Sequence, residues 1–378
     1  MIWKKIALLA VLCISCTLGF SQETDSLSWL SRTARFLLQE DAPVEQGRFL
    51  AYPTIAFAPE TSWEIGLSSI YFYHAKRDTT NRLSEATAFT FITTRGQYGF
   101  WLDHALYTDR NDWFFFGRGR YQNFPLLYFG IGENTPAEEI ALVNATYTLF
   151  RERALRKVKE SFYTGLEIDY QRLTNVGFEW TDESQPNILP LGAEGTSNLG
   201  LGWGLVYDNR HNVLNVRKGF FAELSYINYN FLNANRNNFY SFAIDSRIYR
   251  PVRKNQVFAA QVVGQFMGGE IPFNQLALMG GESMMRGYYL GRYRDRNLTA
   301  GQVEYRWLPF SFSKRIGAAV FGGMGSVFSN FQETPRFVWA GGAGVRILIF
   351  KKKDIFTRFD VAFTEEGRGF YLFLGEAF

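Results

Sequence analysis

The feature of this sequence that most constrains its fold is an alternation of apolar and polar residues with a period of two. Residues 161–171 read SFYTGLEIDYQ, in which Phe162, Leu166 and Ile168 alternate with residues such as Glu167 and Asp169. The same pattern recurs in residues 240–248 and 302–307. Because successive side chains of a strand point to opposite faces of a sheet, these segments predict β-strands with one apolar and one polar face. We therefore expect an all-β chain.

Composition excludes several other classes of protein. Hydrophobic residues make up 47% of the chain and aromatic residues 17%, which is too much apolar surface for a disordered chain. Beyond the N-terminus, no run approaches the roughly 18 consecutive apolar residues that a membrane-spanning helix needs. The formal net charge of +4 is too small to indicate a nucleic-acid partner.

Residues 1–21 are predicted to be a secretory signal peptide. Lys4 and Lys5 precede an apolar run over residues 6–18, and small residues stand near the expected cleavage point after position 21. Both cysteines, Cys13 and Cys16, lie in this segment, so the mature chain would have no disulfide and no thiolate metal site. An alternative is that Cys16 is a lipidated lipoprotein acceptor.

Export and two-faced strands together indicate a transmembrane antiparallel β-barrel in the outer membrane of a Gram-negative cell. The apolar strand faces end in Trp, Tyr and Phe, whereas the polar faces carry charges of both signs. This pattern suits an outer face in lipid and an inner face in a wet lumen. Since every backbone group must be paired at membrane depth, the sheet has to close.

Sixteen strand segments can be placed between residues 48–58 and 368–378, at about twenty residues for each strand with its connection. The longest connections, 124–142 and 175–196, collect acidic residues and are predicted to be extracellular. The short connections each carry Lys or Arg and are predicted to be periplasmic: 76–82, 108–112, 154–159, 208–219, 251–255, 311–315 and 350–353.

The most informative segment connects the eleventh and twelfth predicted strands. It reads QLALMGGESMMRGYY over residues 275–289. A Gly-Gly pair followed by a hydrophobic-Arg-Gly-aromatic run resembles the signature loop of the outer-membrane assembly and two-partner secretion superfamily, the BamA/TamA-like bacterial surface antigen barrels. The matching residues are Gly280, Gly281, Arg286, Gly287 and Tyr288.

Other motifs agree with this resemblance in order along the chain. Asp-Asn-Arg at 208–210 with Lys218 and Gly219 is similar to a family turn, and residues 342–346 and 358–360 are similar to its penultimate hairpins. The likeness covers the second half of the chain through motifs and the first half through architecture only.

The resemblance implies that the loop folds into the lumen and that Arg286 pairs with carboxylates there. The alternation supplies two candidates, because it places Glu304 and Asp360 on the polar faces of the twelfth and fifteenth strands. A guanidinium is a rigid fork that matches carboxylates. Gly287 would let the backbone turn beside the wall, and Tyr288 would pack there. Two roles stay open for Arg286: it only anchors the loop, or it also takes part in moving substrate.

The C-terminal segment carries a second resemblance. The alternation places Phe370, Leu372, Leu374 and Phe378 on one face, and a final aromatic residue is similar to the signal that hands barrels to the barrel assembly machinery. Gly375 is similar to the glycine at which family members loosen the seam between the first and last strands. The alternative is an ordinary strand glycine.

Family members that fold or secrete proteins carry periplasmic POTRA modules ahead of the barrel. Residues 22–47 offer room for one short helix and not for such a module. We therefore expect the barrel to occupy residues 48–378, and the docking modules to be missing or to lie on a separate periplasmic chain.

The sequence gives little support for an enzyme. His74, His104 and His211 are not spaced as a metal pair, and there is no Gly-x-Ser-x-Gly elbow. The glycine runs at 200–204 and 323–326 lie inside strand patterns, which favours wall glycines over phosphate loops. We expect no cofactor, no metal and no enzymatic activity, and a barrel lipase that uses His104 or His211 is the least favoured alternative.

These patterns together predict a barrel that translocates or inserts a polypeptide or a lipid-linked partner, with the Arg286 loop as the conformational element. The alternative is a passive pore or a structural surface antigen without transport activity. The expected partners are outer-membrane lipid, the barrel assembly machinery and a periplasmic docking chain, but not nucleic acid.

Overall fold

The computed structural model describes residues 47–378 except 59–61, 183–187, 211–214, 231–236, 333 and 351–353. The described residues belong to one compact unit, Glu40–Phe378. The predicted signal peptide with both cysteines, and the predicted periplasmic segment up to residue 46, lie outside the described residues.

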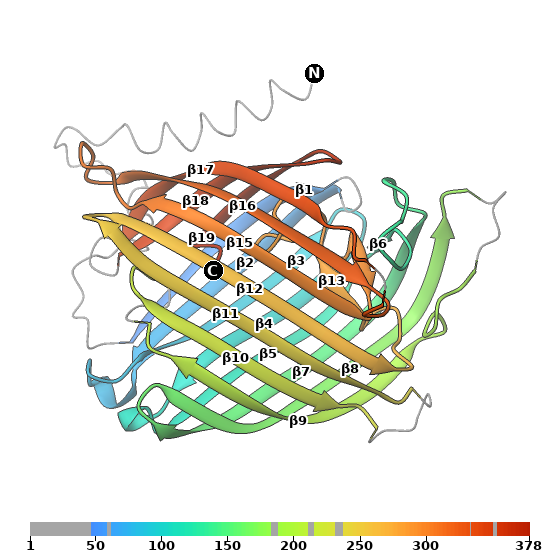
Figure 1. The fold of residues 1–378 in the computed structure, drawn as a ribbon, viewed down its shortest axis with the longest axis horizontal. Helices are drawn as coiled ribbons and strands as arrows, with labels where there is room; N and C mark the ends of the chain where they lie inside the picture. The colour runs from blue at the N-terminus through green and yellow to red at the C-terminus, as the bar shows by residue number, and fades with distance from the viewer. Residues whose placement is uncertain are drawn as a thin grey trace. The chain divides into compact units, whose positions relative to one another are not determined.

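The chain forms strands almost throughout (Figure 1). Two 3-10 turns, η1 (Ala75–Arg77) and η2 (Asp109–Asn111), lie between strands. In the described part of the chain, no helix has the length and hydrophobicity to cross a bilayer. The strands are β1 (Arg48–Ala58), β2 (Ser62–His74), β3 (Leu83–Thr93), β4 (Tyr98–Tyr107), β5 (Trp113–Asn123), β6 (Leu126–Tyr128), β7 (Ala141–Lys159), β8 (Phe162–Trp180), β9 (Thr196–Asp208), β10 (Gly219–Asn228), β11 (Phe239–Arg253), β12 (Gln256–Gly269), β13 (Ala277–Met279), β14 (Tyr293–Asp295), β15 (Asn297–Trp307), β16 (Ile316–Phe328), β17 (Val338–Phe350), β18 (Ile355–Thr364) and β19 (Arg368–Leu374).

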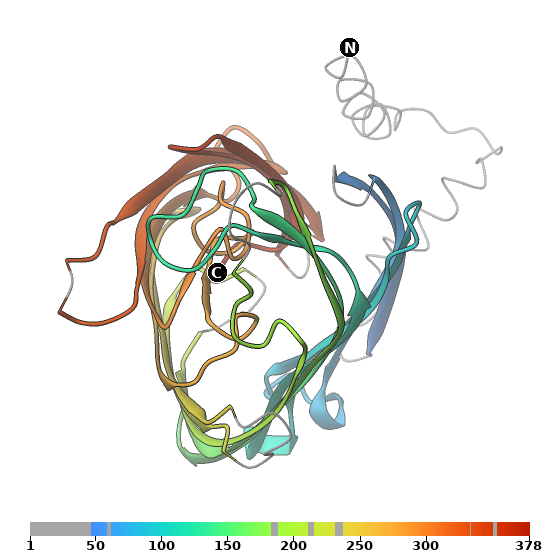
Figure 2. The same ribbon diagram turned by 90° about the vertical axis from the view of Figure 1, so that its right-hand side faces the viewer.

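Antiparallel ladders join neighbouring strands in chain order from β1 to β19. β5 and β6 both pair with β7 and occupy one position in the wall, whereas β13 and β14 form a separate two-stranded sheet. The wall therefore has sixteen strand positions, as predicted. Figure 2 shows the strands arranged around a lumen that holds the segment between β12 and β15 and the C-terminus.

The first and last strands form the two edges of this wall. The registers of the described residues include no ladder between β1 and β19. Instead, Ile70 and Phe72 of β2 form an apolar cluster with Ile355 of β18, against which Leu374 packs. Pro53 in β1 has no N–H to donate to a neighbouring strand. β19 has only seven residues. Side-chain packing therefore links β2 with β18 and β19 at the end of the barrel that carries the short turns.

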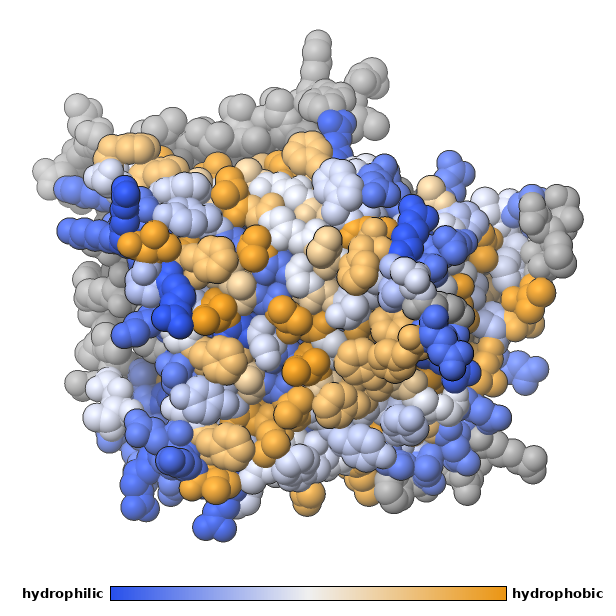
Figure 3. Space-filling model, viewed as in Figure 1, coloured by the Kyte–Doolittle hydropathy of each residue, from blue (hydrophilic) through white to orange (hydrophobic). Residues whose placement is uncertain are grey.

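The alternation seen in the sequence separates the two faces of the wall. Leu166 of β8 points outward and is 72% exposed, whereas its neighbours Glu167 and Asp169 point inward and are buried. Figure 3 shows hydrophobic residues gathered over the middle of the visible face and hydrophilic residues at its two ends. This is the surface of a barrel that spans a membrane.

Several predicted strand boundaries are wrong. Residues 154–159, predicted as a turn, belong to β7, and the turn lies at 160–161. Arg156 in this stretch lies over the outward-facing ring of Trp113, 5.9 Å from its centroid, so its charge sits on the wall and not in the turn. β8 and β11 likewise extend into predicted connections, because their ladders continue to Trp180 and Arg253.

Candidate functional site: an arginine-anchored loop inside the barrel

The connection between β12 and β15, residues 270–296, turns into the lumen and is called the signature loop here. β13 and β14 pair within it, with Ala277 opposite Asp295. Gly280 and Gly287 have φ values of +117° and +112°, which residues with a side chain adopt only with strain. A Cβ atom at Gly287 would lie 2.5 Å from the Thr364 methyl group of β18. The two glycines therefore allow tight turns close to the wall.

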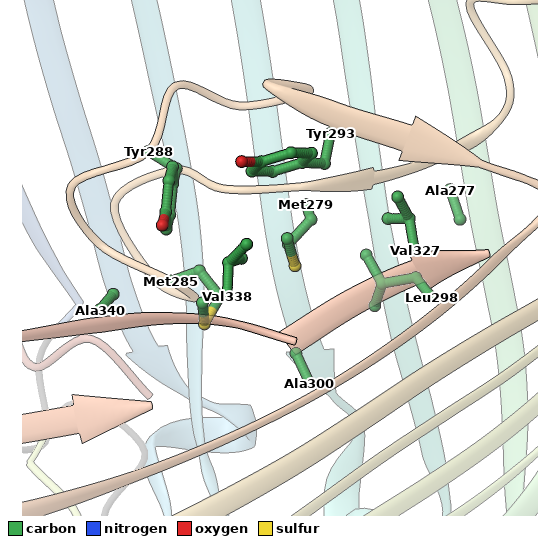
Figure 4. Close-up of a cluster of buried hydrophobic side chains, with 10 residues drawn as sticks. All are labelled: Ala277, Met279, Met285, Tyr288, Tyr293, Leu298, Ala300, Val327, Val338 and Ala340. Atoms are coloured by element: carbon green, nitrogen blue, oxygen red, sulfur yellow. The ribbon is translucent and has the colours of Figure 1, made fainter. Parts of the chain in front are cut away.

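Apolar side chains of the signature loop pack on the inner wall (Figure 4). Tyr288 and Tyr293 meet edge to face, with ring centroids 5.6 Å apart, and burial raises the pKa of both phenols. Gly325 of β16 lies beneath the loop, and a Cβ atom there would be 2.7 Å from the Met279 sulfur. The described residues of this cluster are Ala277, Met279, Met285, Tyr288, Tyr293, Leu298, Ala300, Val327, Val338 and Ala340.

Arg286 lies at the tip of the signature loop, between two strands of the wall. Its Nη2 atom is 2.5 Å from the Glu304 carboxylate on β15, and its Nη1 atom is 2.7 Å from the Asp360 carboxylate on β18. All three side chains have 0% exposure. The guanidinium also lies over the ring of Phe321, 3.4 Å from its centroid. The structure thus brings together the three residues that the resemblance and the alternation single out.

Two further arginines share the Glu304 carboxylate. Arg306 Nε is 2.9 Å from Glu304 Oε1, and Arg346 Nη2 is 3.0 Å from the same atom. Because Arg306 lies two residues from Glu304 on one strand, the alternation already puts both on one face. Arg306 and Arg346 lie within the sequence patterns at 302–307 and 342–346, but neither pattern predicts a place for them in this site.

Asp360 is shared in the same way. Arg346 also pairs with Asp360, and Arg358 Nη1 is 2.9 Å from Asp360 Oδ2. Arg346 Nε is 3.0 Å from Glu376, which no sequence pattern identified. Four arginines and three acids therefore form one buried network in the lumen.

Glu376 reaches this network because the chain turns inward after β19. Gly375 has a φ of +86°, and its N–H donates to the carbonyl oxygen of Phe356 over 2.7 Å. Phe378 then packs in the lumen with Tyr249 and Val257. The backbone oxygen of Phe378 accepts a hydrogen bond from Arg306 Nη2 at 3.0 Å.

The prediction that Phe378 shares a face with Phe370, Leu372 and Leu374 is wrong. Phe370 and Leu372 point outward and are 58% and 66% exposed, whereas Phe378 is buried in the lumen. The left-handed φ of Gly375 ends the strand and reverses the side-chain alternation.

Two backbone groups and one hydroxyl of the signature loop make further contacts with the wall. The N–H of Gly287 donates to the Tyr371 hydroxyl of β19 over 2.8 Å, and the Tyr288 hydroxyl donates to the Trp339 carbonyl oxygen over 3.2 Å. Arg358 Nη2 donates to the Glu282 carbonyl oxygen over 3.0 Å. The loop is therefore fixed to the part of the wall that ends at the seam.

A second arginine holds the signature loop at the end of the barrel that carries the long loops. Arg292 Nε lies 2.6 Å from Glu366 in the β18–β19 turn, and its Nη1 lies 2.6 Å from the Thr135 hydroxyl. The N–H of Gly132 donates to the Arg294 carbonyl oxygen over 2.9 Å. These contacts tie together the signature loop, the 124–140 connection and the β18–β19 turn.

The three histidines do not meet. His74 Nδ1 is 2.8 Å from the Asn81 carbonyl oxygen, His104 Nε2 is 2.8 Å from Glu152, and His211 lies outside the described residues. Within the described ranges, no three or more His, Cys, Asp or Glu side chains are arranged to hold a metal ion.

A sixteen-strand wall with an apolar outer band and a polar lumen defines an outer-membrane β-barrel. Residues 105–378 match the Omp85 superfamily domain, and the chain belongs to this superfamily. Membership makes it a Gram-negative outer-membrane barrel. No curated protein sequence matches the chain.

Solved structures share the fold at low sequence identity. BamA from Haemophilus ducreyi lacking POTRA domains 1-3 is 15% identical, with a TM-score of 0.53, over 87% of this chain and 69% of that one. CdiB from Escherichia coli is 11% identical, with a TM-score of 0.52, over 86% of this chain and 60% of that one. CdiB from Acinetobacter baumannii is 9% identical, with a TM-score of 0.52, over 85% and 58%. The chain thus spans about three-fifths of the length of the two CdiB chains.

Proposed function

We propose that this barrel moves a polypeptide or a lipid-linked client across or into the outer membrane, and that the signature loop changes position as it does so. The observation that carries the proposal is the anchoring of Arg286, on a loop inside the lumen, to Glu304 and Asp360 on two separate strands. Buried ion pairs fix an arrangement more than they stabilise it, which suits a conformational element.

The network allows Arg286 to leave at low cost. Without it, Glu304 keeps Arg306 and Arg346, and Asp360 keeps Arg346 and Arg358. Neither acid is then left as an unpaired buried charge, which is the costly outcome when one partner of a buried pair is lost. The contacts of Arg286 can therefore break and re-form while the wall stays intact.

The seam between β1 and β19 is the proposed route for a client that inserts sideways into lipid. Pro53, the short β19 and the turn at Gly375 all limit the hydrogen bonds that the two edges can make. In this proposal the Ile70, Phe72 and Ile355 cluster holds the seam at rest. A periplasmic partner chain with docking modules would deliver the client.

A passive pore is the second candidate, and one observation favours it. Charged side chains line the lumen away from the signature loop in neutralised pairs, such as Arg153 with Glu167 at 3.0 Å and Arg247 with Asp245 at 2.5 Å. A wall of this kind suits a water-filled channel.

The proposal is tested by replacing the chromosomal copy with Arg286→Ala and comparing the outer-membrane and surface proteins of the cells. The matched control is Arg296→Ala, since Arg296 is an exposed arginine of the same loop. We expect normal amounts of folded barrel in both strains and a loss of specific membrane or surface proteins only in Arg286→Ala. Unchanged protein profiles in both strains would contradict the proposal. Capture of the barrel from membranes with a periplasmic chain would support the partner.

A further inference from the structure

A hydrogen-bonded His–Glu pair lies on the outward face of the barrel wall. His104 of β4 and Glu152 of β7 flank β5, and both are in register with Gly117. His104 Nε2 and Glu152 Oε2 are 2.8 Å apart. His104 shares the outward face of Leu102, and Glu152 that of Phe150, and both of these apolar side chains are exposed.

The pair lies near the middle of the apolar band. On β5, the outward-facing rings of Trp113 and Tyr121 stand near the two margins of the band, and Gly117 is midway between them in the sequence. Between these margins, His104 and Glu152 are the only titratable side chains among the described outward-facing residues of β4, β5 and β7. Ionisable groups at this depth are costly and mark functional positions.

Glycines shape the wall around the pair. A Cβ atom at Gly117 would lie 2.8 Å from His104 Nε2 and would collide with the Glu152 carboxylate, so only glycine lets the two side chains meet across β5. At Gly119, the nearest atom to an added Cβ would be Leu102 Cβ at 4.0 Å. Because Gly117 and Gly119 have no side chains, the outer surface beside the pair is lowered at these two positions. The backbone of another protein can therefore approach it closely.

The pair leaves two polar atoms unused. His104 Nδ1 and Glu152 Oε1 are shielded and have no hydrogen-bond partner among the described residues. When Glu152 is ionised and the imidazole carries its proton on Nε2, both unused atoms are acceptors. The acyl chains of lipids have no hydrogen-bond donor to offer these acceptors in the middle of the bilayer. Hydrolysis would need a nucleophilic hydroxyl, and no described Ser or Thr bonds to Nδ1.

We propose that this face, built from Leu102, His104, Gly117, Gly119 and Glu152, docks a membrane-spanning segment of another protein. That segment presents a hydroxyl or cationic donor to the His104–Glu152 pair, whose side chains are 17% and 24% exposed. A second copy of this chain meeting the same face about a two-fold axis would set acceptors against acceptors and does not fit.

Photocross-linking in the full-length protein tests the proposal. A benzoylphenylalanine replaces Leu102 or Phe150, and the matched control replaces Val262, an outward-facing residue on β12. We expect an adduct with another polypeptide from positions 102 and 150 but not from 262, and its sequenced peptide should carry a hydroxyl or cationic residue inside a membrane-spanning segment.

Two variants show whether the adduct depends on the pair and on the lowered surface. The double variant His104→Leu with Glu152→Leu should insert normally, because replacing both partners of a hydrogen-bonded pair by apolar residues can be nearly neutral. It should reduce the adduct about tenfold or more, which corresponds to about 1.4 kcal/mol. Gly119→Leu fills the lowered surface, keeps the pair and should abolish the adduct at normal barrel levels.

Four outcomes would overturn the proposal. They are adducts with lipid only, adducts with a second copy of the chain, equal adducts from position 262, and an adduct that persists in Gly119→Leu. An adduct that persists in Gly119→Leu contradicts the proposal even if the double variant does not fold.

Discussion

Arg286 and Asp360 are 74 residues apart in the chain, and their side chains are 2.7 Å apart in the lumen. They belong to a buried network in which four arginines face three acids. Removal of Arg286 leaves Glu304 and Asp360 each paired with two other arginines, whereas removal of the Glu304 carboxylate takes a partner from three arginines at once. The two partners of one ion pair should therefore respond differently to substitution.

Glu304→Gln should destabilise the barrel more than Arg286→Ala does. The glutamine removes the carboxylate that Arg286, Arg306 and Arg346 share, so three buried arginines each lose one partner, and removing one partner of a buried ion pair costs about 3–5 kcal/mol. Arg286→Ala leaves each acid paired and should cost about 1–2 kcal/mol. Urea unfolding of the purified barrel in micelles measures both. Equal midpoints for the two variants would show that the charge balance is unimportant.

The double variant Arg286→Ala with Glu304→Gln should be more stable than Glu304→Gln alone. Loss of Arg286 removes one of the three arginines that lose a partner in Glu304→Gln. We expect a coupling of about 0.5–3 kcal/mol between the two positions, the range for residues in one network. The same unfolding series gives this value, and additive effects would contradict a shared network.

Gly344→Ala should weaken the network, because Gly344 of β17 lies directly beside it in the barrel wall. A Cβ atom at Gly344 would collide with the Asp360 carboxylate and would lie 2.7 Å from Arg346 Nη1. We expect a loss of about 1–3 kcal/mol, as for overpacking elsewhere. Gly341→Ala is the control on the same strand, because its Cβ atom would meet only the Phe321 carbonyl oxygen at 3.5 Å. A similar loss in both variants would point to a general effect of alanine in β17.

Arg292→Ala should loosen the contact between the signature loop and the 124–140 connection. It removes the bonds from Arg292 to Glu366 and Thr135. We expect faster proteolytic cleavage within residues 124–140 in intact membranes, with unchanged overall stability. Arg336→Ala serves as the control, because its pair with Glu365 is exposed and 3.5 Å long. Equal cleavage in wild type and Arg292→Ala would contradict this contact.

Much of the fold was predictable from the sequence, because a period of two assigns each strand residue to a face. The alternation predicts that Glu304 and Asp360 face the lumen, and the positions of the turns predict sixteen strands. Exact strand ends were not predictable, since long ladders such as that of β7 and β8 carry charged residues up to the turn.

The rest of the site depended on three-dimensional features that periodicity does not contain. Glu376 and Phe378 reach the lumen only because Gly375 adopts a φ of +86°. A strand pattern continued through this glycine put Phe378 on the wrong face. Likewise, the pairing of His104 with Glu152 across β5 depends on a glycine on the strand between them.

The most direct test of the central claim, that Arg286 holds a mobile loop inside a translocation barrel, is the conductance of single barrels in planar bilayers. The structure predicts that the wild type and Arg296→Ala stay closed or conduct only briefly, because the signature loop occupies the lumen. Arg286→Ala should open several times more often, since the loop loses its contacts with Glu304 and Asp360. A large, steady conductance that is the same in the wild type and in Arg286→Ala would contradict the account and identify a passive pore.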